Sequence, residues 1–197
     1  MTTPKITLLR RDSHRRMPWK NGGGETVEIA VSPDGAGLAD FDWRVSMATV
    51  ATDGPFSVFP GIDRTLSILD GEGMTLFIEG RAPERLTQAS EPLPFAADTP
   101  TSATLIDGTI TDLNVMTRRG SHAHKVTRNI VGDHMELQLA ADTTLLLCDD
   151  DRGLRIDDGD LSLALFAQDC AVMNGPRGRR IRLSGPARFF LIEITAI

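Results

Sequence analysis

The sequence contains only two cysteines and no tyrosine among its 197 residues. Cys148 and Cys170 each lie in an apolar run, and no C-x-x-C spacing occurs, so we expect both to fill the core. A chain of this length can bury a sizeable core without disulfides. Because no signal-like apolar segment occurs near the N-terminus either, we expect a reduced, cytoplasmic location.

Long apolar runs and an excess of positive charge are also absent. No apolar stretch approaches the ~20 residues of a membrane-spanning helix, and 21 basic against 27 acidic residues give a net charge of -6. Such a chain has no overall attraction for nucleic acid or an anionic membrane. The sequence therefore predicts no nucleic-acid or membrane partner, favours a small molecule or a protein as partner, and is compatible with a homo-oligomer.

Helical periodicity is scarce, whereas period-two alternation recurs along the whole chain. Thr26–Val31 and Trp43–Ala48 alternate cleanly between apolar and polar or small residues. This pattern predicts an all-β sandwich or barrel, with a few short helices near Lys5–Arg10 and Val126–Val131. Further expected strands are Arg64–Leu69, Met74–Ile78, Leu86–Ala89, Thr104–Ile106, Leu113–Met116, Glu136–Leu139, Thr143–Cys148, Leu161–Phe166, Ala171–Met173, Arg180–Leu183 and Phe189–Ile194.

An internal repeat is indicated between the two halves of the chain. Asp63–Gly80 aligns without gaps over Asp142–Gly159, and five of the 18 positions are identical. Two similar small barrels would follow from such a duplication. Chance identity between Asp- and Leu-rich segments is the alternative.

The stretch GPFSVFPGIDRTLSILDGEGMTLFI resembles the first motif of the cupin family in everything except its metal ligands. Arg64 stands where the motif has a glutamate, and the two histidine positions fall on Ser57 with Phe59, or on Val58 with Pro60. None of these side chains is a ligand for a divalent metal. The resemblance therefore implies a cupin-like barrel with no metal and no cofactor.

A rival metal site is offered by His122 and His124, whose spacing places two imidazoles on one face of a strand. Arg118 and Arg119 lie just before them, and their charges oppose a cation. We favour an exposed loop without metal at this point. The sequence does not assign a role to the two histidines.

Three segments together resemble the HutD/Ves family of bacterial proteins: MPWKNGGGETVEIAV, FDWRVSMATVATDGPFSVFPGIDRTLSILDGEG and DLNVMTRRG. The likeness is strong from about Thr7 to Gly120 and general beyond it. It implies two cupin-like double-stranded β-barrels in tandem (a bicupin) and no established catalytic activity. For the HutD branch it implies a proposed regulatory part in histidine utilisation through binding of formylglutamate, whereas the Ves branch is stress-associated.

The expected domains are residues 1–120, an N-terminal cupin-like barrel with the ligand pocket, and residues 121–197, a C-terminal cupin-like barrel packed against the first. Alternation predicts that Thr26, Glu28 and Ala30 share one strand face and that Arg44 and Ser46 share another. Such faces suit a lumen that holds a polar ligand. The alternative is that they point to water.

Arg44 and Arg64 suit a carboxylate ligand, because a guanidinium group donates two parallel hydrogen bonds. Glu28 would offset one of these charges, and a Glu28–Arg44 salt bridge is an alternative that leaves only Arg64 free. Lys20 and Asn21 are expected to close the mouth of the pocket. The predicted ligand-binding residues are Trp19, Lys20, Asn21, Thr26, Glu28, Arg44, Ser46, Ser57, Phe59 and Arg64.

Two functions remain open from the sequence. The first is a metal-free bicupin that binds a small anionic metabolite and has a regulatory role. The second is a metal-independent isomerase or hydrolase of a sugar or acyl amino acid, with Glu28 as general base beside Arg44. No histidine partner for Glu28 occurs in the matched segments, which favours binding over catalysis.

Overall fold

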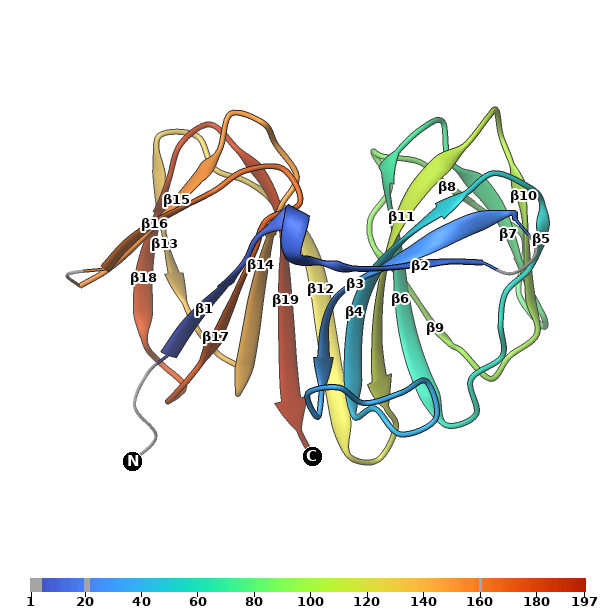
Figure 1. Cartoon of the computed structure of the whole chain (residues 1–197), viewed down its shortest axis with the longest axis horizontal. Helices are drawn as coiled ribbons and strands as arrows, with labels where there is room; N and C mark the ends of the chain where they lie inside the picture. The colour runs from blue at the N-terminus through green and yellow to red at the C-terminus, as the bar shows by residue number, and fades with distance from the viewer. Residues whose placement is uncertain (1–4, 20–21, 160) are drawn as a thin grey trace. The chain divides into compact units, whose positions relative to one another are not determined.

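The computed structural model describes residues 5–19, 22–159 and 161–197, and almost all of its regular structure is strand (Figure 1). Within these residues the single helix is a short 3-10 turn, η1 (Arg11–Ser13). No helix of the described chain is long and apolar enough to cross a membrane. The fold is therefore all-β, as the alternation predicts, and it divides into two compact units.

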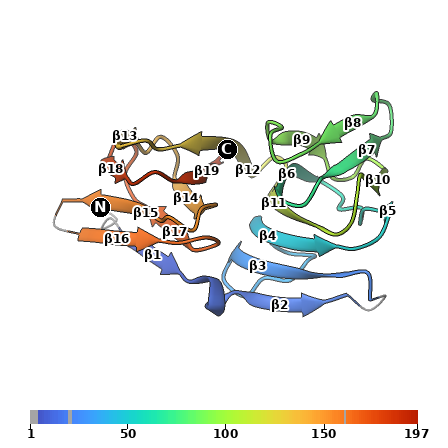
Figure 2. The same cartoon turned by 90° about the horizontal axis from the view of Figure 1, so that it is seen from above.

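The N-terminal unit is formed by Arg15–Ala123. Its first sheet has the strand order β2-β3-β4-β11-β6-β9, and its second has the order β5-β10-β7-β8 (Figure 2). The strands are β2 (Arg15–Pro18), β3 (Gly24–Ser32), β4 (Trp43–Val50), β5 (Gly54–Pro55), β6 (Ile62–Asp70), β7 (Met74–Ile78), β8 (Glu84–Leu86), β9 (Leu93–Ala96), β10 (Thr101–Leu105) and β11 (Ile110–Arg118).

The C-terminal unit is formed by His124–Ala196 together with residues 5–14. Its sheets have the orders β1-β17-β14-β19-β12 and β13-β18-β15-β16. The strands are β1 (Lys5–Leu9), β12 (His122–Ile130), β13 (His134–Gln138), β14 (Thr143–Cys148), β15 (Leu154–Asp158), β16 (Leu161–Leu165), β17 (Cys170–Asn174), β18 (Arg180–Ser184) and β19 (Arg188–Ala196).

Each unit is a pair of sheets with an apolar core between them. In the N-terminal unit, Leu66 and Ile68 of the larger sheet pack with Met74 and Leu76 of the smaller one. None of the four sheets closes on itself among the described strands. The expected closed barrels are therefore wrong in detail, and each unit is an open sandwich of two sheets.

The two units share one topology. The orders β4-β11-β6-β9 and β5-β10-β7-β8 recur as β12-β19-β14-β17 and β13-β18-β15-β16, so that each strand from β4 to β11 is matched, in chain order, by one from β12 to β19. The N-terminal unit adds β2 and β3 beside β4, and the C-terminal unit adds β1 beside β17. This common order supports an internal duplication.

The alignment of Asp63–Gly80 over Asp142–Gly159 is nevertheless wrong by one position. It places Leu66 over Leu145, but Leu66 lies in the core between the sheets of its unit, and Leu146, not Leu145, lies in the matching core. A slip of one residue moves every side chain of a strand to the other face. The structural correspondence therefore pairs Leu66 with Leu146, and the same shift pairs Leu76 with Ile156.

Two further expectations differ from the structure. The sequence predicts helices at Lys5–Arg10 and Val126–Val131, but β1 and β12 occupy these segments. The register of β1 runs from Lys5 opposite Asn174 to Leu9 opposite Cys170. Pairing with a distant strand thus decides the conformation of β1, and it places the start of the chain in the C-terminal unit.

Candidate functional site

The candidate site lies on the face of the six-stranded sheet that looks toward the four-stranded sheet of the N-terminal unit. Residues paired across antiparallel strands share a face. Arg44, Met116, Arg64 and Phe95 are paired in sequence across β4, β11, β6 and β9. They share the face of Leu66, which lies in the core, so both arginines point into the interior of the sandwich.

Polar residues continue this face beside the two arginines. Ser46 is paired with Asn114, and Ala48 is paired with Asp112, on β4 and β11. Asn114 in turn is paired with Leu66 on β6. A row of polar groups therefore runs along β11 next to the apolar core.

A β-bulge changes the predicted faces of β3. Glu28 is paired with Ser46, but Ala30 is paired with Val45 and Val31 with Arg44. Because the register shifts between Glu28 and Ala30, Ala30 leaves the face of Glu28 and Val31 joins that of Arg44. The expectation that Thr26, Glu28 and Ala30 share a face is correct only for the first two.

Arg44 is hydrogen-bonded to two side chains of the same sheet. Its Nε donates to Glu28 Oε2 at 2.7 Å, and its Nη1 donates to Ser46 Oγ at 3.3 Å. The Arg44 and Glu28 side chains are only 5% and 12% exposed. Of the two alternatives from the sequence, the structure shows the Glu28–Arg44 salt bridge.

Arg64 has a different environment. Its guanidinium carbon lies 5.3 Å from the ring centres of Phe56 and Phe59 and 5.8 Å from that of Phe95. Its Nη2 contacts Met116 Sδ at 3.6 Å, and its buried Nε has no hydrogen-bond partner. Among the described residues, no carboxylate forms an ion pair with this arginine, although it is only 4% exposed.

Burial lowers the pKa of Arg64 to about 10, because desolvation penalises the charged form. The negative charge of Asp112 opposes this shift, and the neighbouring Arg44 adds to it. At neutral pH the guanidinium is still charged. Arg64 is therefore a buried cation whose hydrogen-bonding capacity is largely unused.

Asp112 is the second buried ionisable group on this face, at 1% exposure. Burial raises its pKa to about 7, against the opposing charge of Arg64 and hydrogen bonds from Asn114 and the backbone of Ala48. Asn114 Nδ2 donates to Asp112 Oδ1 at 2.6 Å. Sequence reasoning missed Asp112 and Asn114, although the alternation of DLNVM signals a polar face opposite Leu113 and Val115.

Trp19 and Thr26 join the end of β2 to β3. Trp19 Nε1 donates to Thr26 Oγ1 at 2.8 Å, and Trp19 N donates to the carbonyl of Gly24. A side chain at Gly24 would place Cβ 2.0 Å from the Thr49 carbonyl oxygen, so glycine is required where β3 approaches β4. One role of the glycine run is thus to allow this close approach.

The remaining predicted residues are distributed differently. Phe59 lies against Arg64, as described above, whereas Ser57 is exposed. Lys20 and Asn21 lie outside the described residues.

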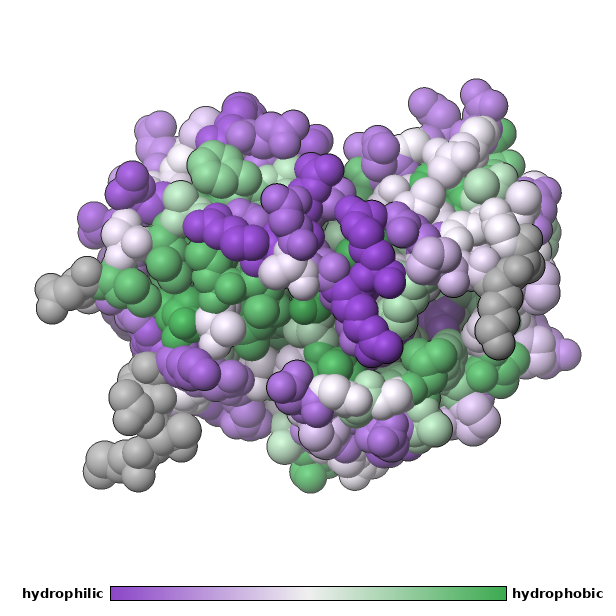
Figure 3. Space-filling model, in the orientation of Figure 1, coloured by the Kyte–Doolittle hydropathy of each residue, from purple (hydrophilic) through white to green (hydrophobic). Residues whose placement is uncertain are grey.

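The surface of the N-terminal unit is hollowed where β6 and β9 are seen in Figure 1, and hydrophilic atoms lie at the base of the hollow (Figure 3).

His122 and His124 lie on a strand and not in the expected exposed loop. His122 and His124 both lie on β12 and are half-buried, and His122 Nδ1 is 3.1 Å from Ser121 Oγ. Within the part of the chain that the structure describes, no group of three or more histidine, cysteine or acidic side chains is arranged to hold a metal ion.

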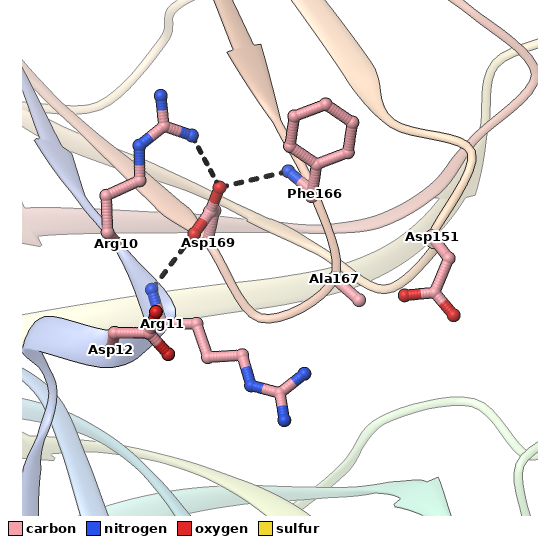
Figure 4. A pocket seen from close by; sticks show the side chains of 7 residues that line it. All are labelled: Arg10, Arg11, Asp12, Asp151, Phe166, Ala167 and Asp169. Atoms are coloured by element: carbon pink, nitrogen blue, oxygen red, sulfur yellow. Dashed lines mark hydrogen bonds and ion pairs between the residues drawn. The ribbon is translucent and has the colours of Figure 1, made fainter.

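The C-terminal unit has a shallow cavity of about 420 Å³ that is lined mainly by charged residues (Figure 4). Asp169 accepts hydrogen bonds from Arg10 Nη1 at 2.6 Å and from the backbone N–H groups of Arg11 and Phe166. This carboxylate is therefore satisfied by the fold and attaches the segment after β1 to the turn before β17. The cavity is lined by Arg10, Arg11, Asp12, Asp151, Phe166, Ala167 and Asp169.

The model of the HutD family matches residues 11–191 of the chain. Over 112 residues the chain is 39% identical to an uncharacterized 21.2 kDa protein in the hutC 3′ region of Pseudomonas putida, covering 57% of this chain and 58% of that protein. Over 117 residues it is 42% identical to protein Ves of Citrobacter koseri, covering 57% and 59%. The matched part of the chain thus spans less than two thirds of the length of these curated relatives.

Solved structures resemble the whole chain. HutD from Pseudomonas fluorescens SBW25, in a formate condition, has a TM-score of 0.84 at 32% identity and covers 98% of this chain and 100% of that one. Protein Ylba from Escherichia coli has a TM-score of 0.70 at 9% identity, with 96% and 90% covered, which shows a cupin-like fold alone.

Proposed function

The chain belongs to the HutD family, and we propose that its N-terminal unit binds a small carboxylate metabolite without a metal, as part of a regulatory role in histidine utilisation. Formylglutamate is the proposed ligand. In this proposal the two cupin-like sandwiches form a bicupin, of which only the first carries the ligand site. The protein acts in the cytoplasm.

The observation that carries the proposal is the unpaired, buried guanidinium of Arg64. A desolvated cation lowers stability unless it gains a partner of opposite charge. Carboxylate oxygens match the fork of an arginine, which donates two parallel hydrogen bonds to them. The three phenyl rings around Arg64 exclude water and would strengthen such a pair, because the local dielectric is low.

The position of Arg64 in the cupin motif supports the same proposal. A metal-binding cupin has a glutamate here, and this chain has a cation with Phe59 against it. The electrostatic preference of the interior is therefore for an anion. The names of the relatives, a protein of a hutC region and HutD itself, are the support for histidine utilisation.

The enzyme alternative is weakened by the engagement of Glu28. A general base must be free to accept a proton from its substrate. Glu28 Oε2 instead accepts a hydrogen bond from Arg44, and Arg15 Nη1 lies 3.9 Å from its other oxygen. Glu28 is thus engaged as the ion-pair partner of Arg44, with Arg15 nearby, so we propose binding and not turnover.

Titration calorimetry with formylglutamate and glutarate tests this function on the wild type, Arg64→Lys and Arg64→Ala. Loss of a buried charged partner costs about 2–5 kcal/mol, or about 30- to 4,000-fold in Kd at about 1.4 kcal/mol per decade. We expect Arg64→Ala to lose affinity within this range and Arg64→Lys to be intermediate, because lysine retains the charge without the fork.

The exposed Arg85→Ala on β8 is the matched control and should bind like the wild type. Equal affinity of all four proteins for the acids would contradict the proposal. So would a wild type that binds neither acid, or one that hydrolyses formylglutamate at a rate that depends on Glu28.

A further inference from the structure

The cavity of the C-terminal unit contains three charged side chains that the fold leaves unused. Arg11 and Asp12 come from η1, and Asp151 comes from the turn between β14 and β15. All three are exposed, and none forms an ion pair or a side-chain hydrogen bond with another described residue. Arg10 and Asp169, in contrast, are paired with each other at 2.6 Å. Figure 4 shows the side chains of Arg11 and Asp151 extending from opposite sides toward the open space between them.

Phe166 adds a large apolar surface to the same cavity. Its ring is 52% exposed. A Cβ on Gly153 would lie 3.1 Å from the ring, so one side of the ring packs against the backbone of Gly153. In the N-terminal unit the residue that follows β8, as Phe166 follows β16, is Thr87. The shared topology therefore does not require a phenyl ring at this position.

Hydrogen bonds fix the turn that presents this ring. Gln168 has a φ of +69°, a left-handed conformation that is uncommon for residues other than glycine. Its N–H donates to the carbonyl of Cys148 at 2.8 Å, and its carbonyl accepts from His14 Nε2 at 2.8 Å. The Phe166 N–H donates to the buried Asp169 carboxylate at 3.1 Å. The ring is thus attached to a turn that is already ordered, which lowers the entropy cost of ligand binding.

These groups define the chemistry of a ligand. A guanidinium group binds a carboxylate, a carboxylate binds an ammonium group, and a phenyl ring packs against another ring. An aromatic α-amino acid carries all three complementary groups. The cavity volume of about 420 Å³ lies within the ~300–1,000 Å³ of small-molecule sites. The second free carboxylate, Asp12, adjoins Arg11 and disfavours a ligand with a further acidic group.

We propose that this cavity binds a free aromatic amino acid, with its carboxylate on Arg11, its ammonium group on Asp151 and its ring against Phe166. The site lies within the C-terminal unit and is independent of the carboxylate site proposed at Arg64. Because both charged side chains are exposed, each ion pair contributes only about two- to fivefold to the affinity. The expected Kd of L-phenylalanine is on the order of 1 mM, since the cavity is shallow.

An NMR titration of the ¹⁵N-labelled full chain with L-phenylalanine tests this inference. The backbone N–H signals of Gly153 and Ala167 should shift in a saturable manner. Phenethylamine lacks the carboxylate and 3-phenylpropionate lacks the ammonium group, whereas both retain the ring. Each analogue should therefore bind about two- to fivefold more weakly than phenylalanine.

Three variants assign the roles of the side chains. Arg11→Gln should remove the advantage of phenylalanine over phenethylamine, and Asp151→Asn should remove its advantage over 3-phenylpropionate. Phe166→Ser should weaken the binding of all three compounds, because each loses the contact between rings. The exposed Arg180→Gln on β18 is the matched control for loss of a positive charge and should bind like the wild type.

The inference is overturned if phenylalanine gives no saturable shift of the Gly153 and Ala167 signals, or if it binds no more tightly than the two analogues. If its advantages survive in Arg11→Gln and Asp151→Asn, the assignment to these two residues is overturned. Arg64→Ala should bind phenylalanine like the wild type, so that this inference and the proposed function fail separately. Loss of phenylalanine binding in Arg64→Ala would place the amino acid in the N-terminal unit and overturn the inference.

Discussion

Arg44 and Arg64 flank Met116 in one row across the sheet, and among the described residues only Arg44 of these two has a carboxylate in ion-pair contact. The two arginines are equally buried, at 4% exposure each. They differ in what surrounds the guanidinium, a glutamate and a serine for Arg44 and three phenyl rings with a thioether for Arg64. We therefore propose that Arg44 stabilises the fold and that Arg64 is available to a ligand.

This difference predicts opposite effects of the same substitution. Arg44→Met leaves the Glu28 carboxylate, which is only 12% exposed, without its main partner and should lower the free energy of unfolding by about 3–5 kcal/mol. Arg64→Met removes a buried charge that has no ion-pair partner among the described residues. It should raise that free energy by about 1–3 kcal/mol, because burial penalises the charged form and lowers the pKa of Arg64. Urea denaturation of both variants measures the effect, and destabilisation by Arg64→Met would show that the charge is already satisfied within the protein.

The raised pKa of Asp112 predicts how stability depends on pH. Folded Asp112 keeps its proton up to about pH 7, whereas the unfolded group loses it near 3.8. The folded state therefore binds more protons in this window, and the free energy of unfolding should fall as pH rises from about 4 to about 7, by up to about 4 kcal/mol. Asp112→Asn should remove this fall, whereas the control Asp70→Asn should keep it. Urea denaturation at several pH values measures the free energy of unfolding of each variant. If this free energy depends on pH in the same way for wild type and Asp112→Asn, the buried carboxyl is not protonated as described.

The close approach of β3 to β4 predicts that Gly24 tolerates no side chain. Gly24→Ala would place Cβ 2.0 Å from the Thr49 carbonyl oxygen, so the backbone must move and we expect a loss of about 2 kcal/mol or more. Gly132→Ala is the control, because nothing lies within 4 Å of the added Cβ and the change should stay below about 1 kcal/mol. Equal melting temperatures for the two variants would show that β3 is not held against β4 as described.

The replaced ligands of the cupin motif predict the metal content. Ser57, Phe59 and Arg64 offer no divalent cation a site, so elemental analysis of the purified protein should find no stoichiometric iron, manganese, zinc or nickel. The double variant His122→Ala/His124→Ala distinguishes a metal bound by the histidines of β12 from a metal bound inside the N-terminal sandwich. One equivalent of metal that resists chelation and persists in this variant would contradict the account.

The sequence predicts most of the strands, because alternation is visible wherever one strand face is buried. It does not predict β1 and β12 as strands, since short amphiphilic segments such as Lys5–Leu9 take their conformation from a distant partner. The bulge after Glu28 is equally invisible, as it depends on the register with β4. The repeat is detectable from the sequence. However, the alignment with the most identical residues is shifted by one residue from the structural correspondence, so it pairs inward-facing residues of one unit with outward-facing residues of the other.

The candidate site is partly predictable for the same reason. Glu28, Arg44 and Arg64 stand out from the alternation and the altered cupin motif. Phe56 and Phe95 become neighbours of Arg64 only once the loop before β6 and the pairing with β9 are known. Sequence reasoning misses Asp112 because the segment DLNVM is assigned as an apolar strand as a whole. Only when alternate residues are considered separately do Asp112 and Asn114 fall on one polar face.

The most direct test of the central claim is the NMR signal of the Arg64 Nε–H group, in protein labelled with ¹⁵N-arginine and assigned by comparison with Arg64→Lys. This Nε has no hydrogen-bond partner in the part of the chain that the structure describes, whereas Arg44 Nε already donates to Glu28. Addition of formylglutamate should shift the Arg64 Nε–H signal in a saturable manner, slow its exchange with water and leave the Arg44 signal nearly unchanged. An Arg64 signal that does not respond to saturating carboxylate would contradict the account.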